Sequence, residues 1–146
     1  VAFLASGDEP AAIHRRPYAT VQPNQLEILR AALEGLQRDP EMPVTWLRLP
    51  HARIGRYGEL DDWEPIIDPA RNLAGTEVAV FLRELGDGTV KVSLRSNGRT
   101  DVAGVAHALG GGGHDKAAGA VVEGSLDEVA TRIRALLRPL FPGSGP

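Results

Sequence analysis

The residues with the clearest capacity for chemistry lie in one segment, SLRSNGRTDVAGVAHALGGGGHDKAAG, which spans residues 93–119. Four consecutive glycines end at Gly113, and His114 follows directly. Glycine has no side chain to bury and loses much conformational entropy on ordering, so a run of four is expected where the backbone must approach another group closely. Consecutive backbone N–H groups can form a nest that binds an anion. The run therefore predicts a loop that binds phosphate.

Two other roles for the glycines explain less. A flexible linker would not need the His, Lys and Arg side chains that flank the run, and it would not lie between two short apolar elements. A helix C-cap accounts for one glycine, Gly110, but not for four. The run is not a Walker loop, because no Gly-Lys-Ser/Thr ending follows. It is not a dinucleotide fingerprint either, because its spacing differs and a strand follows it.

Basic and hydroxyl side chains near the glycines strengthen the phosphate hypothesis. Arg95 and Ser96 end a predicted strand, and Arg99, His114 and Lys116 are predicted to surround the same loop. Phosphate is bound by a combination of arginine forks, point charges and main-chain donors. All three kinds of donor are expected here.

No catalytic residue and no metal ligand is predicted in this chain. The serines near Arg95 lack a Gly-x-Ser-x-Gly elbow and a paired base. A catalytic metal requires clustered ligands, for example two histidines at i and i+4, and the histidines of this chain do not have that spacing. They are His14, His51, His107 and His114.

The composition suits a single domain with a hydrophobic core. The chain has 146 residues, of which 42% are hydrophobic, and a net charge of −3. This charge excludes a general electrostatic track for duplex DNA, so a nucleic-acid role must depend on a local pocket. Cysteine is absent, which excludes disulfides and thiolate metal sites. No apolar run approaches the roughly 18 residues of a membrane span, so a cytoplasmic protein without membrane contact is expected.

The first half of the chain predicts a helix, a strand, a loop and a second helix. A helix begins at Pro23, and four leucines are expected on its buried stripe. They are Leu26, Leu29, Leu33 and Leu36. Residues 43–50 begin and end with proline, which predicts a strand near the edge of a sheet. Residues 51–62 predict a loop, and Asp68 is expected to cap a short helix that ends at Gly75.

The second half begins with a β-hairpin. Residues 76–85 and 89–96 are rich in β-forming residues and are joined by Gly-Asp-Gly. Alternation places Val90, Val92 and Leu94 on one face of the second strand. Lys91, Ser93 and Arg95 then share the other face.

A helix, a strand and a further helix complete the pattern. Asp101 is expected to cap a short helix that leads into the glycines, and residues 117–124 predict a strand. Ser125 and Glu128 predict a capping box for the last helix. Its inward residues are expected to be Val129, Ile133, Leu136 and Leu137. The chain is therefore predicted to be an α/β domain with a small mixed sheet flanked by helices, preceded by a helical linker segment.

The two tryptophans have two possible roles. Trp46 and Trp63 are expected in the core, and a platform on which a base stacks is the alternative.

These motifs together resemble the DHH-associated type-1 (DHHA1) domain, the C-terminal half of DHH-family phosphoesterases, whose hallmark is Gly-Gly-Gly-His. The resemblance covers residues 75–138 and is fainter over 23–74. The subgroup that it resembles most is that of the oligoribonuclease (nanoRNase)/pAp-phosphatase enzymes, with RecJ-type exonucleases and cyclic di-AMP phosphodiesterases more distant. The segments that carry the resemblance are VAVFLRE, KVSLRS, DVAGVAHALGGGGHDKAAG and GSLDEV.

The resemblance implies a larger, two-domain bacterial enzyme, of which this chain, beginning with Val1, would be a fragment. Residues 1–22 would be the linker from a missing N-terminal DHH domain, 23–140 the DHHA1-like substrate-binding domain, and 141–146 a flexible tail. The DHH half would bind two Mn²⁺ ions, which activate water and polarise the phosphoryl group. This chain would bind no cofactor of its own, and alone it would be inactive.

The resemblance also implies which residues bind the substrate. Ser93 and Arg95 match substrate-facing strand positions, and Arg83 occupies a weaker position in FLRE. The loop that binds phosphate and nucleotide would be Gly111, Gly112, Gly113 and His114. Ser96 and Lys116 complete the predicted set.

The implied function is substrate binding in an enzyme that degrades short RNA, dephosphorylates adenosine 3′,5′-bisphosphate, or both. Its partners would be short RNA or nucleotide phosphates and the DHH domain of the same protein, and the oligomeric state stays open. One alternative is a parent enzyme that acts on cyclic di-AMP or, as RecJ does, on single strands. The other is a free-standing, non-catalytic module that binds nucleic acid.

Overall fold

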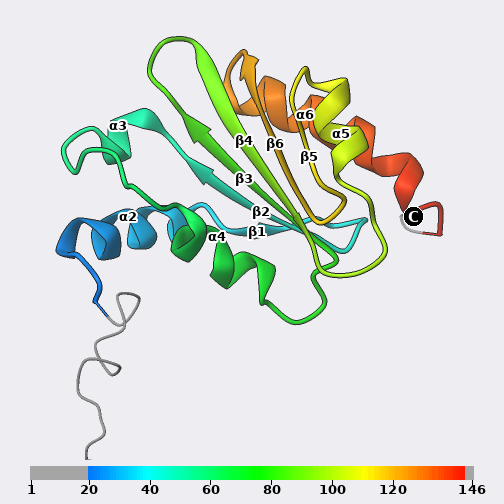
Figure 1. Ribbon diagram of the computed structural model, residues 1–146, viewed down its shortest axis with the longest axis horizontal. Helices are drawn as coiled ribbons and strands as arrows, with labels where there is room; N and C mark the ends of the chain where they lie inside the picture. The colour runs from blue at the N-terminus through cyan, green and yellow to red at the C-terminus, as the bar shows by residue number, and fades with distance from the viewer. Residues whose placement is uncertain (1–19, 144–146) are drawn as a thin grey trace, which may run out of the picture.

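A computed structural model describes residues 20–143 of the protein. In this range the chain forms one six-stranded sheet with helices on both faces (Figure 1). The expected linker at 1–22 and the expected tail at 141–146 lie largely outside the described residues. No helix among residues 20–143 is long and apolar enough to cross a lipid bilayer.

The order of the elements confirms the predicted α/β fold. The helices are α2 (Pro23–Glu34), α3 (His51–Ile54), α4 (Glu64–Arg71), α5 (Ala103–Ala108), α6 (Leu126–Leu137) and the 3-10 helix η2 (Arg138–Leu140). The strands are β1 (Gln37–Arg38), β2 (Val44–Leu49), β3 (Val78–Glu84), β4 (Thr89–Ser96), β5 (Gly112–Gly113) and β6 (Ala117–Glu123). They lie in the order β1-β2-β3-β4-β6-β5, and the sheet is mixed because β2 and β3 are parallel while the other neighbours are antiparallel.

One face of the sheet carries the larger core, under α5 and α6. Val90, Val92 and Leu94 of β4 are fully buried there, as their alternation predicted. Helix α6 begins with the predicted capping box: the Ser125 side chain accepts from the Glu128 N–H, and Glu128 accepts from the Ser125 N–H. Its inward residues also join this core, with Val129, Ile133 and Leu137 buried and Leu136 packed against them.

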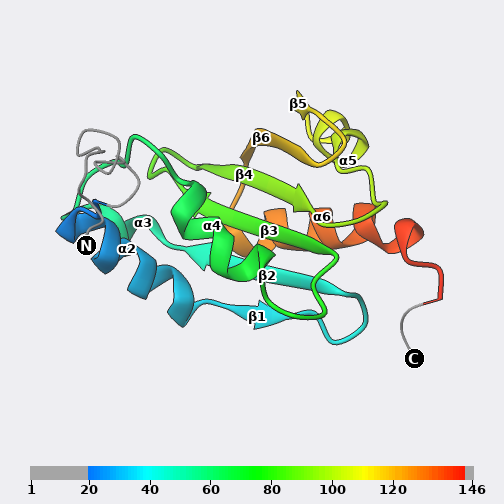
Figure 2. The ribbon, with the colours of Figure 1, turned by 60° about the horizontal axis from the view of Figure 1, so that its bottom comes forward.

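The opposite face of the sheet is covered only in part. Helices α2 and α4 pack on β2 and β3, where Leu47, Leu49 and Phe81 are buried beneath them. In Figure 2, α4 lies across β2 and β3 and leaves most of β4 and β6 uncovered; its first residue, Glu64, bonds to Arg95 of β4. The side chains that β4 and β6 direct to this face are therefore accessible.

Helix α2 buries a different stripe from the expected one. Ile28, Ala31 and Ala32 are buried against α4 and β2, whereas Leu26 and Leu33 are 56% and 42% exposed. The leucine prediction was therefore wrong for these two residues. Alanines let the helix approach its neighbours closely, and this contact decides which face turns inward.

Helix α4 begins five residues earlier than expected, at Glu64 rather than directly after a cap at Asp68. Pro65 lies in its first turn, where a missing N–H is tolerated, and Pro69 lies inside the helix. The earlier start buries Ile66 and Ile67, which offsets the hydrogen bond that the inner proline cannot make.

Strand β2 lies near the edge of the sheet, as predicted, and the two-residue strand β1 pairs with it on its outer side. Pro43 and Pro50 flank the paired residues Val44–Leu49, so no N–H of the ladder is lost. The loop expected at 51–62 contains the short helix α3.

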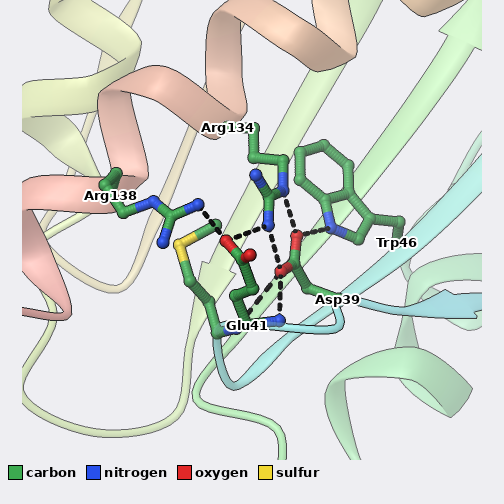
Figure 3. Close-up of polar contacts among 6 residues, drawn as sticks. Asp39, Glu41, Trp46, Arg134 and Arg138 are labelled. Carbon is green, nitrogen blue, oxygen red and sulfur yellow. Dashed lines mark hydrogen bonds and ion pairs between the residues drawn. The ribbon is translucent and has the colours of Figure 1, made fainter. Parts of the chain in front are cut away.

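A charged cluster joins α6 and η2 to the loop between β1 and β2 (Figure 3). The Asp39 carboxylate accepts from Arg134 Nε at 2.7 Å, from Arg134 Nη2 at 2.9 Å and from Trp46 Nε1 at 3.2 Å. Glu41 accepts from Arg134 and Arg138. The Asp39 side chain is 2% exposed, so Arg134 joins the last helix to the end of the sheet through a largely buried carboxylate, and Arg138 does so through Glu41.

Candidate functional site

A cleft of about 370 Å³ lies on the part of the sheet that α2 and α4 leave uncovered. Strands β3, β4, β5 and β6 form its floor, and the start of α4 forms one wall. Its lining residues are Asp62, Trp63, Glu64, Phe81, Arg83, Lys91, Ser93, Arg95, Gly112, Gly113, Ala117, Ala118 and Gly119.

The strand register explains why the cleft is hollow. Ser93 lies opposite Phe81 on one side and Gly119 on the other, and Gly119 lies opposite Gly112. The row of residues that crosses the floor from β3 to β5 therefore ends in two glycines, which have no side chains. The bare backbone leaves room for a ligand directly against the sheet.

Packing against β6 requires two of the glycines in the run. A Cβ on Gly111 would lie 2.0 Å from the carbonyl oxygen of Gly119, and one on Gly113 would lie 2.5 Å from Ala118 Cα. Gly113 also has φ = 145°, a conformation that other residues rarely adopt. The run thus brings a short edge strand close to β6, which is part of what the four glycines accomplish.

Three cationic side chains border the bare row. Arg83 and Lys91 lie opposite each other on β3 and β4, and Arg95 lies further along β4 on the same face. Arg83 Nη1 donates to Glu59 at 2.8 Å, and Arg95 Nη2 donates to Glu64 at 2.6 Å. Among the described residues no carboxylate pairs with Lys91. The cleft is therefore suited to an anion.

Trp63 lies between the core and the cleft. The Arg83 guanidinium lies over its ring, 3.9 Å from the ring centroid, and the ring of Phe81 is 5.9 Å away, centroid to centroid. Trp46, by contrast, is 4% exposed in the core, as expected. Trp63 is half-buried and contributes to a wall of the cleft.

The structure brings together five of the residues predicted to bind substrate. Arg83, Ser93, Arg95, Gly112 and Gly113 all line the cleft.

The other four predicted residues do not line it. Ser96 is buried on the opposite face of β4, and the Lys116 ammonium donates to the carbonyl oxygen of Gly98 at 2.6 Å. His114 is exposed in the turn between β5 and β6, and Gly111 lies just before β5.

The expected nest of free amides is wrong for Gly111. Its N–H donates to the carbonyl oxygen of Ala106 at 2.8 Å. The N–H of His114 donates to Ala117 in the same way, at 2.8 Å. Hydrogen-bonded and non-bonded pairs alternate in an antiparallel ladder, so the Gly113 N–H points away from β6. The loop therefore shapes the cleft more than it donates hydrogen bonds.

Sequence reasoning missed several residues of the cleft. Lys91 shares a face with Ser93 and Arg95, and this alternation was a usable signal. Trp63 and Glu64 arrive from α4, more than 25 residues away along the chain, and no local pattern connects them to β4.

The described residues do not fit the manganese site that the DHHA1 resemblance implies for the parent enzyme. Among residues 20–143, no three His, Asp or Glu side chains gather into a possible metal site. Of the two carboxylates in the cleft, Asp62 and Glu64, the second is bound by Arg95.

The fold and the site define the class of the protein: an α/β domain with a cationic cleft above a floor of glycines. The chain belongs to the DHHA1 domain family, whose pattern residues 52–139 match.

Two curated proteins are similar to this chain in sequence. A bifunctional oligoribonuclease and PAP phosphatase, NrnA, from Thermus thermophilus is 40% identical over 89 residues, which are 60% of this chain and 27% of that protein. A cyclic-di-AMP phosphodiesterase, GdpP, from Geobacillus thermodenitrificans is 32% identical over 80 residues, 54% of this chain and 12% of that protein. The chain thus spans about a quarter or less of the length of these relatives.

Two solved structures show the same fold. An exopolyphosphatase-related protein from Bacteroides fragilis superposes with a TM-score of 0.80 at 23% identity, covering 90% of this chain and 39% of that one. The pGpG-specific phosphodiesterase PggH from Vibrio cholerae has a TM-score of 0.55 at 14% identity, covering 84% and 40%.

Proposed function

We propose that this chain is the substrate-binding part of a bacterial, cytoplasmic phosphoesterase of the DHH family. Its ligand is a short oligoribonucleotide, adenosine 3′,5′-bisphosphate, or both. The observation that carries the proposal is the cleft, in which Arg83, Lys91 and Arg95 lie near two adjacent glycines of the floor, Gly112 and Gly119. Membership in the DHHA1 family and the similarity to NrnA support the choice of ligand.

The size and charge of the cleft agree with a short ligand. Long single strands are bound along extended basic grooves, whereas this chain has a net charge of −3, and three of its 16 Lys and Arg residues line this one cleft. The Lys91 ammonium, the Ser93 hydroxyl and the Arg95 guanidinium can together bind a single phosphate group. Gly112 and Gly119 let it approach the backbone.

In this proposal the chain binds and orients the ligand, and the reaction occurs against the DHH half. Two Mn²⁺ ions of that half would supply the activated water. The exposed His114 and Lys116 stay predicted contacts for parts of the substrate that extend beyond the cleft. The purified 146-residue chain is expected not to hydrolyse short RNA when Mn²⁺ is added. Metal-dependent turnover by this chain alone would contradict the proposal.

The similarity to GdpP supports a second candidate ligand, a cyclic dinucleotide. Such a ligand carries internal phosphodiesters only. Competition between cyclic di-AMP and adenosine 3′,5′-bisphosphate for the chain distinguishes the two candidates, because the tighter ligand displaces the other at lower concentration.

The binding experiment titrates fluorescently labelled diadenylate and the bisphosphate into the chain and into its Arg95→Ala variant. Charged hydrogen bonds are strong, so the variant should bind about tenfold more weakly or worse. Arg132→Ala, on the exposed surface of α6 under the opposite face of the sheet, is the matched control and should bind as wild type does. Unchanged binding by Arg95→Ala would remove Arg95 from the site.

A further inference from the structure

The ion pair between Arg95 and Glu64 lies in the wall of the cleft and is held by several bonds. Arg95 Nε donates to Glu64 Oε2 at 2.9 Å and to Oε1 at 3.2 Å, and Arg95 Nη2 donates to Oε2 at 2.6 Å. Arg95 Nη1 donates to the carbonyl oxygen of Leu94 at 2.9 Å. The guanidinium plane is therefore fixed from two sides.

The fixed guanidinium still has donors for a ligand. A guanidinium carries five N–H groups, one on Nε and two on each Nη. Glu64 occupies the N–H of Nε and one on Nη2, and Leu94 occupies one on Nη1. One N–H on each terminal nitrogen is left, which is the number that a bidentate contact with phosphate uses. A phosphate can thus bind Arg95 without displacing Glu64.

The Glu64 carboxylate can accept further hydrogen bonds while it is paired with Arg95. A carboxylate accepts about four hydrogen bonds, and from residues 20–143 Oε1 of Glu64 receives only the 3.2 Å contact from Arg95 Nε. The Glu64 side chain is 41% exposed and lines the cleft. Beside a phosphate on Arg95, the ligand would therefore meet an acceptor that bears a negative charge.

The ligand group that meets this acceptor must be a hydrogen-bond donor, because a second phosphate oxygen would be repelled by the carboxylate. In a ribonucleotide the sugar hydroxyls are the donors bonded closest to the phosphate. Acidic side chains bind ribose hydroxyls in the same way in dinucleotide-binding folds, and the 2′-hydroxyl distinguishes RNA from DNA.

We infer that Glu64 is a specificity-determining residue, which accepts a hydrogen bond from the 2′-hydroxyl of a ligand whose phosphate is bound by Arg95. The inference rests on the proposed function and adds a preference for ribonucleotides over deoxyribonucleotides. Glu64 would thus have two roles: it orients Arg95, and it recognises the 2′-hydroxyl of the ligand.

The test compares 5′-phosphorylated diadenylate with its 2′-deoxy counterpart by calorimetric titration of the chain. Wild type should prefer the ribonucleotide by about tenfold, the usual effect of one hydrogen bond to a charged group. Glu64→Ala should bind both ligands with affinities within about twofold of each other. A purely structural role would change both affinities together and leave their ratio as it was.

Controls separate the possible failures. Asp61→Ala removes a carboxylate from an exposed position near Glu64 that does not line the cleft, and it should keep the wild-type ratio. The unfolding temperature checks that Glu64→Ala is folded. Glu64→Gln keeps the length of the side chain, loses its charge and should also lower the ratio.

Equal binding of the two ligands by wild type, or an unchanged ratio in both Glu64 variants, would overturn the inference and leave the proposed function in place. Binding of neither ligand by wild type would instead overturn the proposed function, and this inference with it.

Discussion

Replacing Arg134 by methionine removes the central cation of the cluster that joins α6 to the β1–β2 loop. Methionine keeps most of the length of the side chain and its helix propensity, so the change isolates the charge and its hydrogen bonds. Asp39 loses the donors at 2.7 and 2.9 Å, and Glu41 loses the one at 3.1 Å. The Asp39 carboxylate, 2% exposed, then has no counter-charge.

The structure sets the expected size of the effect. Breaking a buried ion pair by removing one partner costs about 3–5 kcal/mol. Arg134 itself is 33% exposed, and Asp39 keeps hydrogen bonds from Trp46 Nε1 and from the backbone N–H groups of Glu41 and Met42. Both facts reduce the loss, so the free energy of unfolding should fall by about 2 kcal/mol. For a domain of this length that is a decrease of about 8 °C in Tm.

The assay is urea unfolding followed by circular dichroism, with a double-mutant cycle. Arg134→Met, Asp39→Asn and the double variant give the coupling energy between the two side chains, expected at about 1–2 kcal/mol. Arg132→Met is the control, because Arg132 is exposed on the same helix and its side chain makes a long hydrogen bond, of 3.4 Å, to the carbonyl oxygen of Ala108. It should change stability by less than about 0.5 kcal/mol.

A loss of less than about 0.5 kcal/mol in Arg134→Met, or a coupling energy near zero, would refute this reasoning. It would mean that solvent and the remaining donors satisfy Asp39 fully, and that the cluster does not hold α6 to the sheet.

Three further predictions concern pH, the floor of the cleft and the last helix. Burial alone would raise the pKa of Asp39, but hydrogen bonds, with that from Arg134 the largest, together lower it below its ordinary 3.8. The unfolded chain therefore binds this proton more readily, and the stability that Asp39 contributes, present above about pH 4, should be lost as pH falls further, less steeply in Arg134→Met. Gly119→Ala places a Cβ 2.7 Å from a backbone oxygen of β4 and should cost about 1–3 kcal/mol of stability and weaken ligand binding. Gly104→Ala, in open space on α5, is its control and should not destabilise the protein. Ser125→Ala removes the capping box and should cost about 1 kcal/mol in urea unfolding.

Local patterns were enough to predict much of the fold. The alternation in β4 placed Val90 and Lys91 on opposite faces, and the capping box located the start of α6 at Ser125. The two strands of the hairpin, β3 and β4, and the third predicted strand, β6, were also found. These features depend on residues within a few positions of each other, so the chain carries their signal locally.

Contacts between distant segments decided the rest. The register of α2 depends on Ala31 and Ala32 fitting against α4, and the start of α4 depends on burying Ile66 and Ile67. Neither outcome follows from a periodic pattern, because each depends on the shape of a neighbouring element.

The candidate site divides in the same way. Its cations and glycines are visible in the sequence, as Lys91, Arg95 and the run that ends at Gly113. That they border a cleft, and that Glu64 binds Arg95 there, follows only from the tertiary structure. Helices α2 and α4 pack on β2 and β3, and packing between segments far apart in the chain decides that β4 and β6 stay open on this face.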